Sequence, residues 1–257
     1  VSPITDAGTL SPLILLGLKP KIMDTEKMSY NVSLDQIKKR ISKNTKLVLL
    51  VHAAGKSVEM KGIKSFLKRK KIFLLEDCSQ AHGARCYNCK NCSCKIKVGN
   101  FGDISAFSTM NRKIHMTGPT GGLTFTKSRK FHLKLRAYSD RGKPFWKKKF
   151  DERNPNQFLF PALNLNSNEI NCAMGLASLK RLNETIKKRV KIISYLEKKL
   201  KKKSIFCKIQ NFSKYDSPFF IPVIFKKNKF IKKIDFAKKL IKLSVPLNPD
   251  YKYLTTD

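Results

Sequence analysis

The 257-residue sequence has few acidic residues, only 18 Asp and Glu against 54 Lys and Arg, and its formal net charge is +36 at pH 7. Such an excess of positive charge is typical of proteins that bind nucleic acid or anionic membranes. Here lysine far outnumbers arginine and is spread over the whole chain, whereas base recognition and bidentate phosphate binding favour arginine. We therefore interpret the charge as a solvated lysine-rich surface and expect neither nucleic acid nor a membrane as a partner.

The sequence also lacks an apolar run of the roughly 18 to 20 residues that a membrane span needs, and it lacks the pattern of a secretion signal. We therefore expect a soluble, cytoplasmic protein. Its seven cysteines then favour reduced thiols or a metal over disulfides. Four of them could hold zinc, but their spacing is tighter than in typical zinc fingers, and we prefer a reduced surface loop without metal. These four are Cys86, Cys89, Cys92 and Cys94.

Strand and helix patterns alternate in the first half of the chain. Leu- and Val-rich runs at 46–55 and 71–83 flank a segment with helical spacing of apolar residues, which predicts two parallel, buried strands joined by a helix. "DISAFST" and "GGLTFT" predict two further strands, and Ser33 is the expected N-cap of a helix at 34–42. This alternation indicates an α/β fold built on a sheet.

The texture of the sequence changes near Asn168. Apolar residues then recur every three or four positions over 168–203, which predicts one long or kinked helix, or two in succession. A strand at 219–225 and a helix at 233–244 are expected to follow. We therefore predict a large domain at 1–150, and a helical connector with a small α+β domain at 151–257.

Three polar side chains are predicted at one edge of the sheet. Asp77 ends one strand, and Ser108 and Lys113 follow the end of the next; ligands of open α/β sheets bind at such strand ends. A carboxylate, a hydroxyl and an amine suit pyridoxal phosphate (PLP), which needs a lysine for a Schiff base and an aspartate for its pyridine nitrogen. Gly121 and Gly122 would let the backbone pass close to the lysine loop. Each signal is weak by itself, since a strand-end Asp is as often a turn residue or a helix cap.

Three segments together resemble the motifs of one enzyme family: "EDCSQAHGA" at 76–84, "GDISAFSTMNRKIHMTGPTGG" at 102–122 and "LNLNSNEINCAMGLASLKRL" at 163–182. In order and spacing they are similar to the DegT/DnrJ/StrS family of PLP-dependent nucleotide-sugar aminotransferases, over nearly the whole chain. The resemblance implies a PLP-dependent transferase type I fold, like that of aspartate aminotransferase, with a mainly parallel sheet. It also implies transamination of a nucleotide-linked keto sugar by an amino-acid donor such as glutamate, in amino-sugar or cell-surface polysaccharide biosynthesis.

The resemblance also assigns roles to five residues. It makes Lys113 the lysine that holds PLP as a Schiff base and then shuttles the proton. It makes Asp77 the partner of the pyridine nitrogen, places Gln80 beside the phenolic oxygen of PLP, and makes Ser108 a phosphate ligand. Asn164 matches an asparagine that reaches the phosphate of the neighbouring subunit, which implies a homodimer with composite active sites.

The chain departs from the family pattern in several places. Residues 1–9 match an early strand of the family, and Thr5 matches a residue near the cofactor, but the phosphate-binding segment that precedes this strand is missing. The first residue is Val rather than Met and the last segment stops just after an expected strand and turn, so we expect both ends to be truncated. Asp6 stands where many members have an aromatic ring, and Asn166 replaces the usual arginine. His82 lies within the first motif, where a packed histidine and a direct role are equally expected.

Three other interpretations stay open. A PLP-dependent keto-sugar dehydratase of the same family has histidine in place of the lysine; Lys113 argues against it, although His115 is only two residues away. A basic nucleic-acid-binding protein with a small zinc module explains the charge and the cysteines but not the ordered motifs. An inactive fragment is the third, because the N-terminal part of the family pattern is missing.

Overall fold

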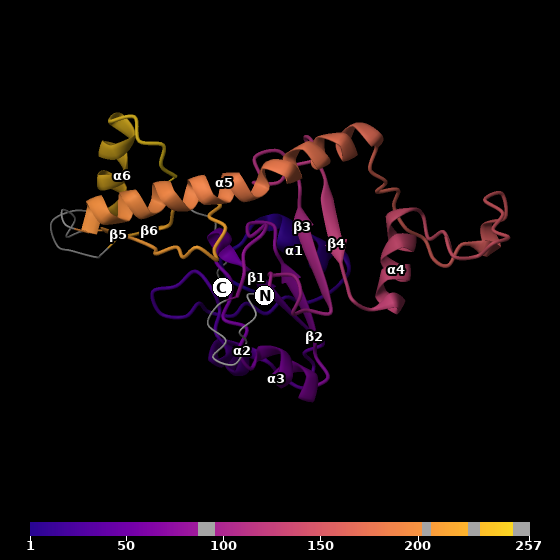
Figure 1. Cartoon of the computed structure of the whole chain (residues 1–257). Coiled ribbons are helices and arrows are strands. Elements are labelled where there is room, and N and C mark those ends of the chain that lie inside the picture. Colours follow the sequence, from indigo (N-terminus) through magenta and orange to yellow (C-terminus); the bar gives the residue numbers. More distant parts are fainter. Residues whose placement is uncertain (87–95, 202–206, 226–231, 249–257) are drawn as a thin grey trace.

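A four-stranded sheet forms the centre of the protein (Figure 1). The structure is a computed structural model that describes residues 1–86, 96–201, 207–225 and 232–248. The strand order is β1-β2-β3-β4, with β1, β2 and β3 parallel and β4 antiparallel to β3, which confirms the expected mainly parallel α/β sheet. The strands are β1 Leu47–Val51, β2 Phe73–Asp77, β3 Ile104–Ser108 and β4 Gly122–Phe125.

Two short helices cover one part of this sheet, α2 (Leu34–Arg40) and α3 (Ile63–Arg69). The Ser33 side chain accepts a hydrogen bond from the Gln36 backbone, so the predicted N-cap is confirmed. The main core forms where both helices meet β1 and β2, and there Ile37, Leu50 and Ile63 are fully buried. Burial of these aliphatic side chains fixes the strands and therefore the positions of the strand ends.

The expected strand at residues 1–9 is wrong. The segment is linked to β1 by the backbone hydrogen bond from Ser2 to Leu49, at 3.2 Å, but it forms no strand, and helix α1 (Ala7–Leu15) begins within it. The Asp6 side chain accepts a hydrogen bond from the Gly8 backbone and so caps the helix that begins at Ala7, although the Asp6 backbone itself is extended.

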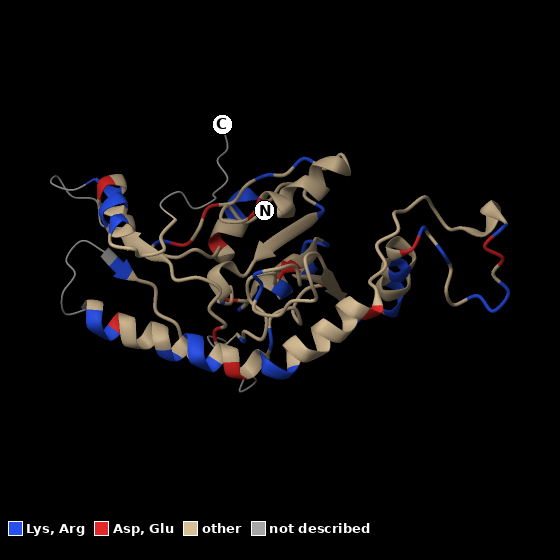
Figure 2. Ribbon diagram, turned by 90° about the horizontal axis from the view of Figure 1, so that it is seen from above, with Lys and Arg blue, Asp and Glu red and all other residues tan. Residues whose placement is uncertain are grey.

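One helix, α5 (Glu169–Lys201), spans the molecule between its two ends (Figures 1 and 2). Of the forms expected for 168–203, the single long helix is the one observed. Near its first end lie α4 (Arg129–Ser139) and the segment 140–165, which extends away from the sheet. Near its other end lie β5 (Cys207–Ile209), β6 (Val223–Phe225) and α6 (Lys233–Lys242), which form the expected small α+β unit. The domain boundary at 150 stays a prediction.

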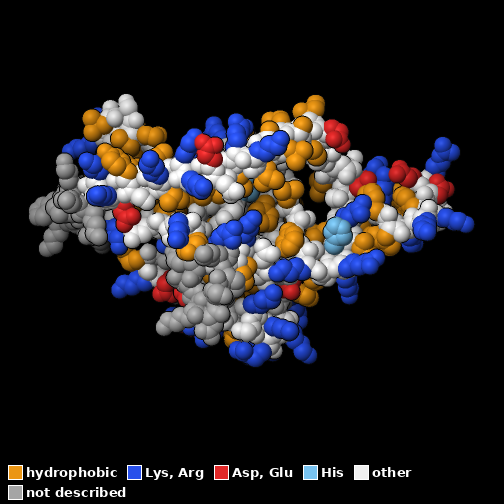
Figure 3. Space-filling model, in the orientation of Figure 1, with side chains coloured by type: hydrophobic (Ala, Val, Ile, Leu, Met, Phe, Trp, Pro, Cys, Tyr) orange, Lys and Arg blue, Asp and Glu red, His pale blue; other side chains and the backbone are white. Residues whose placement is uncertain are grey.

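The positive charge on the surface of the described residues is not concentrated in one patch on the face seen in Figure 3. Lys and Arg side chains are scattered over the face seen in Figure 3. No helix in the described part of the chain is long and apolar enough to cross a membrane. Of the four clustered cysteines, Cys86 is buried, whereas Cys89, Cys92 and Cys94 lie outside the described residues. The expectation about zinc binding therefore concerns residues that the structure does not describe.

Candidate functional site

Two of the predicted residues lie at the same edge of the sheet. Asp77 is the last residue of β2 and Ser108 is the last residue of β3. The Ser108 backbone N–H donates a hydrogen bond of 3.2 Å to Ser79 Oγ, and the Cys78 backbone donates one of 2.8 Å to the carbonyl of Ala106. The chain after Asp77 is therefore fastened to the end of β3, as the carboxyl ends of parallel neighbours require.

The Asp77 carboxylate is held from two sides. Its Oδ1 accepts a hydrogen bond of 2.9 Å from the Ser79 backbone, and its Oδ2 accepts one of 2.8 Å from Thr9 Oγ1 on α1. Thr5, which is almost fully buried, places its Oγ1 2.6 Å from Thr9 Oγ1. Sequence reasoning did not identify Thr9, although its position four residues after Thr5 puts both hydroxyls on one side of a starting helix.

Gln80 joins this edge to the turn after β1. Gln80 is buried, and its Oε1 accepts a hydrogen bond of 2.8 Å from the backbone of Ala54, which has a left-handed φ of 59°. The same turn receives the segment 217–219, because the Phe219 backbone donates to the Ala54 carbonyl at 3.0 Å. A Cβ on Gly55 would lie only 1.8 Å from the Ser217 carbonyl oxygen, so only glycine permits this approach.

The side chain of Lys113 points toward this segment. Its Nζ lies 4.8 Å from the centre of the Phe219 ring, a cation–π distance. Arg189 of α5 holds the segment in place by donating to the carbonyls of Pro218 and Phe219, both at 3.1 Å. Lys113 is therefore connected to Gln80 through Phe219 and the turn after β1. Lys113 also acts electrostatically on His82, as do Asp77 and the Ser108 backbone.

The glycine pair is close to the lysine loop, as expected. Thr109 and Thr117 hydrogen bond through their hydroxyls at 2.7 Å and close the loop that carries Lys113. Gly121 has a φ of 154°, and a Cβ there would lie 2.2 Å from Thr117 Oγ1 and 2.6 Å from Thr109 Oγ1. A larger residue would therefore force this closed loop open.

His82 lies between the predicted groups and is buried. Its ring is 5.9 Å from that of His115 and 5.7 Å from that of Phe107. Burial, together with the charges of His115 and Lys113, lowers the pKa of His82 to about 4, and the Ser108 backbone and Asp77 oppose this only in part. Among the described residues no hydrogen bond of good geometry reaches either ring nitrogen, although the Ser108 backbone lies close enough to raise the pKa. A buried imidazole with unused polar atoms fits a site that accepts a polar ligand.

His115 faces helix α5. Its Nδ1 lies 3.3 Å from Ser178 Oγ, which also accepts a hydrogen bond of 3.1 Å from the Met116 backbone, and burial lowers the pKa of His115. Between this loop and α5 lies an open cavity of about 160 Å³, lined in part by Lys113, Arg181 and Thr185. The lysine loop is thus fastened to α5 through His115, while Lys113 remains next to a cavity.

Asn164 does not join the other four predicted residues. It is exposed, in the segment between α4 and α5, where it pairs with Asp140 through a backbone bridge. Its Oδ1 accepts hydrogen bonds from the backbone and side chain of Asn166, at 3.4 and 3.0 Å. Within one chain, therefore, the candidate site consists of Asp77, Gln80, Ser108 and Lys113.

A buried carboxylate just before Asp77 supports the strand end. Glu76 accepts hydrogen bonds from His52 Nε2 at 2.9 Å and from the backbones of Gly99 at 2.9 Å, Phe101 at 2.8 Å and Gly102 at 2.5 Å. Burial by itself raises the pKa of Glu76, but these hydrogen bonds and His52 outweigh it and lower the pKa. Although His52, Glu76 and Cys78 could together ligate a metal, Glu76 already has these donors and His52 Nδ1 accepts from the Val58 backbone. We therefore assign this cluster to the framework of the site.

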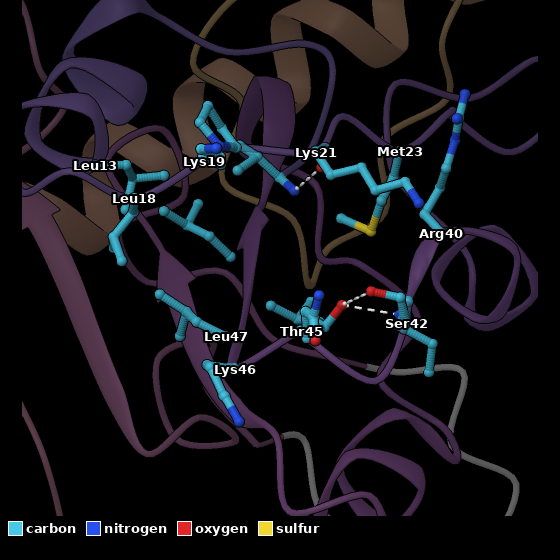
Figure 4. Close-up of a pocket in the computed structure, with 16 residues that line it drawn as sticks. Leu13, Leu18, Lys19, Lys21, Met23, Arg40, Ser42, Thr45, Lys46 and Leu47 are labelled. Atoms are coloured by element: carbon cyan, nitrogen blue, oxygen red, sulfur yellow. Dashed lines mark hydrogen bonds between the residues drawn. The ribbon is translucent and has the colours of Figure 1, made fainter.

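A larger cavity, of about 300 Å³, lies at the opposite end of β1 (Figure 4). Leu13, Met23 and Leu47 line it, and the cations Lys21 and Arg40 stand around it. It contains none of the predicted site residues. Since ligands of open α/β sheets bind at the carboxyl ends of strands, we place the candidate site at Asp77 and not in this larger cavity.

Comparison with solved structures supports the fold class. The structure of the GDP-4-keto-6-deoxy-D-mannose-3-dehydratase of E. coli with bound hydrated PLP matches with a TM-score of 0.82 and 24% sequence identity, over 96% of this chain and 64% of that chain. This similarity establishes the α/β fold. The sequence model of the DegT/DnrJ/EryC1/StrS aminotransferase family matches residues 1–255, and the chain therefore belongs to this family.

Two curated relatives are bacterial proteins named for lipopolysaccharide biosynthesis and for GDP-perosamine synthesis. The lipopolysaccharide biosynthesis protein RfbH of Salmonella typhimurium is 24% identical over 90% of this chain and 56% of its own length. A GDP-perosamine synthase of Caulobacter vibrioides is 27% identical over 78% of this chain and 50% of its own length. The chain thus spans about half the length of the curated relatives that it matches.

Proposed function

We propose that the protein binds PLP at the carboxyl ends of β2 and β3 and transaminates a nucleotide-linked keto sugar, with an amino-acid donor such as glutamate. The observation that carries this proposal is the gathering of Asp77, Gln80, Ser108 and Lys113 at one edge of the sheet in a member of this family. The GDP-perosamine synthases among the relatives support a nucleotide sugar as substrate.

The residues present fit PLP chemically. When bound, PLP supplies an electron sink for negative charge on the carbon of the amino donor. Asp77 has carboxylate lone pairs left to accept the pyridine N–H, and the Ser108 hydroxyl suits a phosphate oxygen. Lys113 would hold the cofactor through its amine, and the same amine could act as the base that accepts the proton from the donor carbon. Gln80, which the Ala54 backbone fixes, would lie beside the phenolic oxygen of the cofactor.

We also propose a homodimer with composite sites, in which Asn164 serves the neighbouring subunit. Its exposure, and its pairing with Asp140 in the segment between α4 and α5, support this role. Large apolar side chains nearby are exposed in the single chain, with Phe145 at 42%, Trp146 at 41% and Leu163 at 71%, and a partner subunit would cover such a surface. Placement in the cytoplasm, and in amino-sugar or polysaccharide biosynthesis, completes the proposal; the name of RfbH supports the latter.

Dehydration of a keto sugar is the second candidate, because the fold also matches a dehydratase. That reaction would need His115 in the place of the lysine. His115 is buried against Ser178 of α5, whereas the Lys113 amine lies over the Phe219 ring. These contacts favour transamination through Lys113.

The test is covalent capture of the cofactor. We expect the intact gene product to develop a visible absorbance band with PLP, and borohydride to fix the cofactor to Lys113. A Lys113→Ala variant should lose the fixation, while Lys130→Ala, which changes an exposed lysine of α4, should retain it. Absence of a band in the folded wild-type protein would refute the proposal. Mass spectrometry of a GDP-linked keto sugar incubated with glutamate then separates an amino-sugar product from a deoxygenated one.

A further inference from the structure

Helix α1 contributes a hydroxyl to the candidate site. Thr9 Oγ1 donates a hydrogen bond of 2.8 Å to Asp77 Oδ2, although 68 residues separate the two in sequence. Described interactions of α1 with the rest of the protein are sparse, since none of its residues is buried. Thr9 nevertheless contacts the Asp77 carboxylate, which is central to the candidate site. This contact therefore suggests a role for Thr9 beyond holding the helix in place.

The direction of the hydrogen bonds follows from chemistry. An ionised carboxylate only accepts, so the single hydroxyl proton of Thr9 is donated to Asp77. At 2.6 Å from Thr9 Oγ1, the Thr5 hydroxyl must then be the donor to Thr9. Thr5, Thr9 and Asp77 form a hydroxyl relay, in which each hydrogen bond polarises and strengthens the next. Thr5 is only 2% exposed, so water does not compete at its start.

We propose that Thr9, with Thr5 behind it, is a positioning residue that turns the Asp77 carboxylate toward the pyridine nitrogen and so sets how tightly the protein holds PLP. This inference rests on the proposed function. The Ser79 backbone fixes Oδ1 and Thr9 fixes Oδ2, so the carboxylate is clamped by one hydrogen bond on each oxygen. A carboxylate accepts about four hydrogen bonds, which leaves capacity for the pyridine N–H in one defined orientation.

The two hydrogen bonds that hold the Asp77 carboxylate come from two different parts of the fold. Ser79 follows β2 directly, so its contact forms with the strand, whereas Thr9 reaches Asp77 only when α1 is in place. Without the Thr9 hydroxyl, the Ser79 backbone alone would still hold the carboxylate at this clamp, and the carboxylate would lose part of its orientation but not its charge. Cofactor affinity should therefore fall while the sheet stays intact.

The experiment compares Thr9→Val with Thr9→Ser in the intact protein. Valine keeps the shape of threonine without its hydroxyl, and serine keeps the hydroxyl. Loss of a hydrogen bond to a charged group should raise the PLP dissociation constant of Thr9→Val by about tenfold or more, and Thr9→Ser should stay within about twofold of wild type. Ser11→Ala is the matched control on the same helix, because the Ser11 hydroxyl donates to the Ala7 carbonyl and is exposed.

Two further readouts separate positioning from stability. The melting temperature without PLP should be similar for Thr9→Val and Ser11→Ala, and the visible band of the PLP-loaded protein should change its pH dependence only in Thr9→Val. Thr5→Val should raise the dissociation constant by roughly twofold to tenfold on its own. In the Thr9→Val background it should add little, because both residues act through one contact.

The results distinguish failure of the proposed function from failure of the inference about Thr9. If wild type binds no PLP, the proposed function fails, and the inference with it. If wild type binds PLP and Thr9→Val binds it equally tightly, only the inference is overturned. A melting temperature that falls for Thr9→Val without a change in PLP binding assigns Thr9 to structure alone and also overturns it. Should Thr9→Val not fold, an unchanged dissociation constant for Thr5→Val would reject the relay.

Discussion

Replacement of Glu76 by glutamine is the sharpest test of how the strand end is held. Each Glu76 oxygen accepts two hydrogen bonds: Oε2 from His52 and Gly99, and Oε1 from Phe101 and Gly102. Glutamine keeps the size of the side chain but replaces one oxygen by an NH₂ group. Whichever way the amide turns, two donors then face a donor and lose their acceptor; the pair on Oε2 is buried and the pair on Oε1 is partly buried.

The expected loss follows from these contacts. A buried donor left without a partner costs about 1 to 3 kcal/mol, so two should lower the free energy of unfolding by about 2 to 6 kcal/mol. Because the pKa of Glu76 is lowered from its ordinary value of 4.5, the ionised carboxylate stabilises the fold above that pH, and this stabilisation is lost as the pH falls through the lower folded value. The difference between wild type and Glu76→Gln should therefore narrow in acid.

Urea unfolding of the intact protein without PLP measures the loss directly. The control is Glu184→Gln on α5, whose carboxylate is 66% exposed and pairs with Lys188, and which should change the unfolding free energy by less than about 0.5 kcal/mol. A loss below about 1 kcal/mol for Glu76→Gln would refute the reasoning, because it would mean that the orphaned donors find other partners.

Three further predictions concern the loop, the buried histidine and the subunit contact. Gly121→Ala should destabilise the protein by about 1 to 3 kcal/mol and lower PLP capture, since its Cβ would meet the Thr109 and Thr117 hydroxyls; an unchanged melting temperature would contradict this. Burial lowers the pKa of His82 to about 4 in the folded protein, so the neutral imidazole favours the folded state above the unfolded-state pKa, and this stability is lost as the pH falls toward about 4. Between about pH 7 and about pH 4.5, the free energy of unfolding of wild type should therefore fall by about 2 kcal/mol more than that of His82→Phe, as measured by urea unfolding. The Lys113→Ala and Asn164→Ala variants should each be inactive alone, but a mixture of the two should regain up to about a quarter of wild-type activity. The reason is that each mixed dimer contains one intact composite site. No recovery after verified subunit exchange would reject the composite site.

The elements governed by local pattern could be predicted from the sequence. The parallel strands, the Ser33 cap and the long helix at 168–203 are periodic or end in a specific capping residue, and they were found close to their predicted places. The strand at residues 1–9 failed, because the Asp6 side chain bonds the Gly8 backbone and starts a helix instead. The similarity to the family could not predict that this side-chain cap would favour a helix over the expected strand.

Contacts between distant segments could not be predicted. Asp77 and Ser108 were predicted at one sheet edge from strand order alone, and the structure places them there. Thr9 and Phe219 carry no motif, and they meet Asp77 and Lys113 only through tertiary packing. The roles of Asp77, Gln80, Ser108, Lys113 and Asn164 toward the cofactor stay predictions until PLP binding is measured.

The docking of Phe219 has a consequence for biosynthesis. Lys113 leaves the ribosome about a hundred residues before the segment that covers it. A nascent chain can therefore form the sheet before the Phe219 ring reaches the lysine, because Arg189 can hold that segment only after its two carbonyl partners have been synthesised. Cofactor loading should accordingly be a late event, which follows translation of the C-terminal segment and does not accompany folding of the sheet.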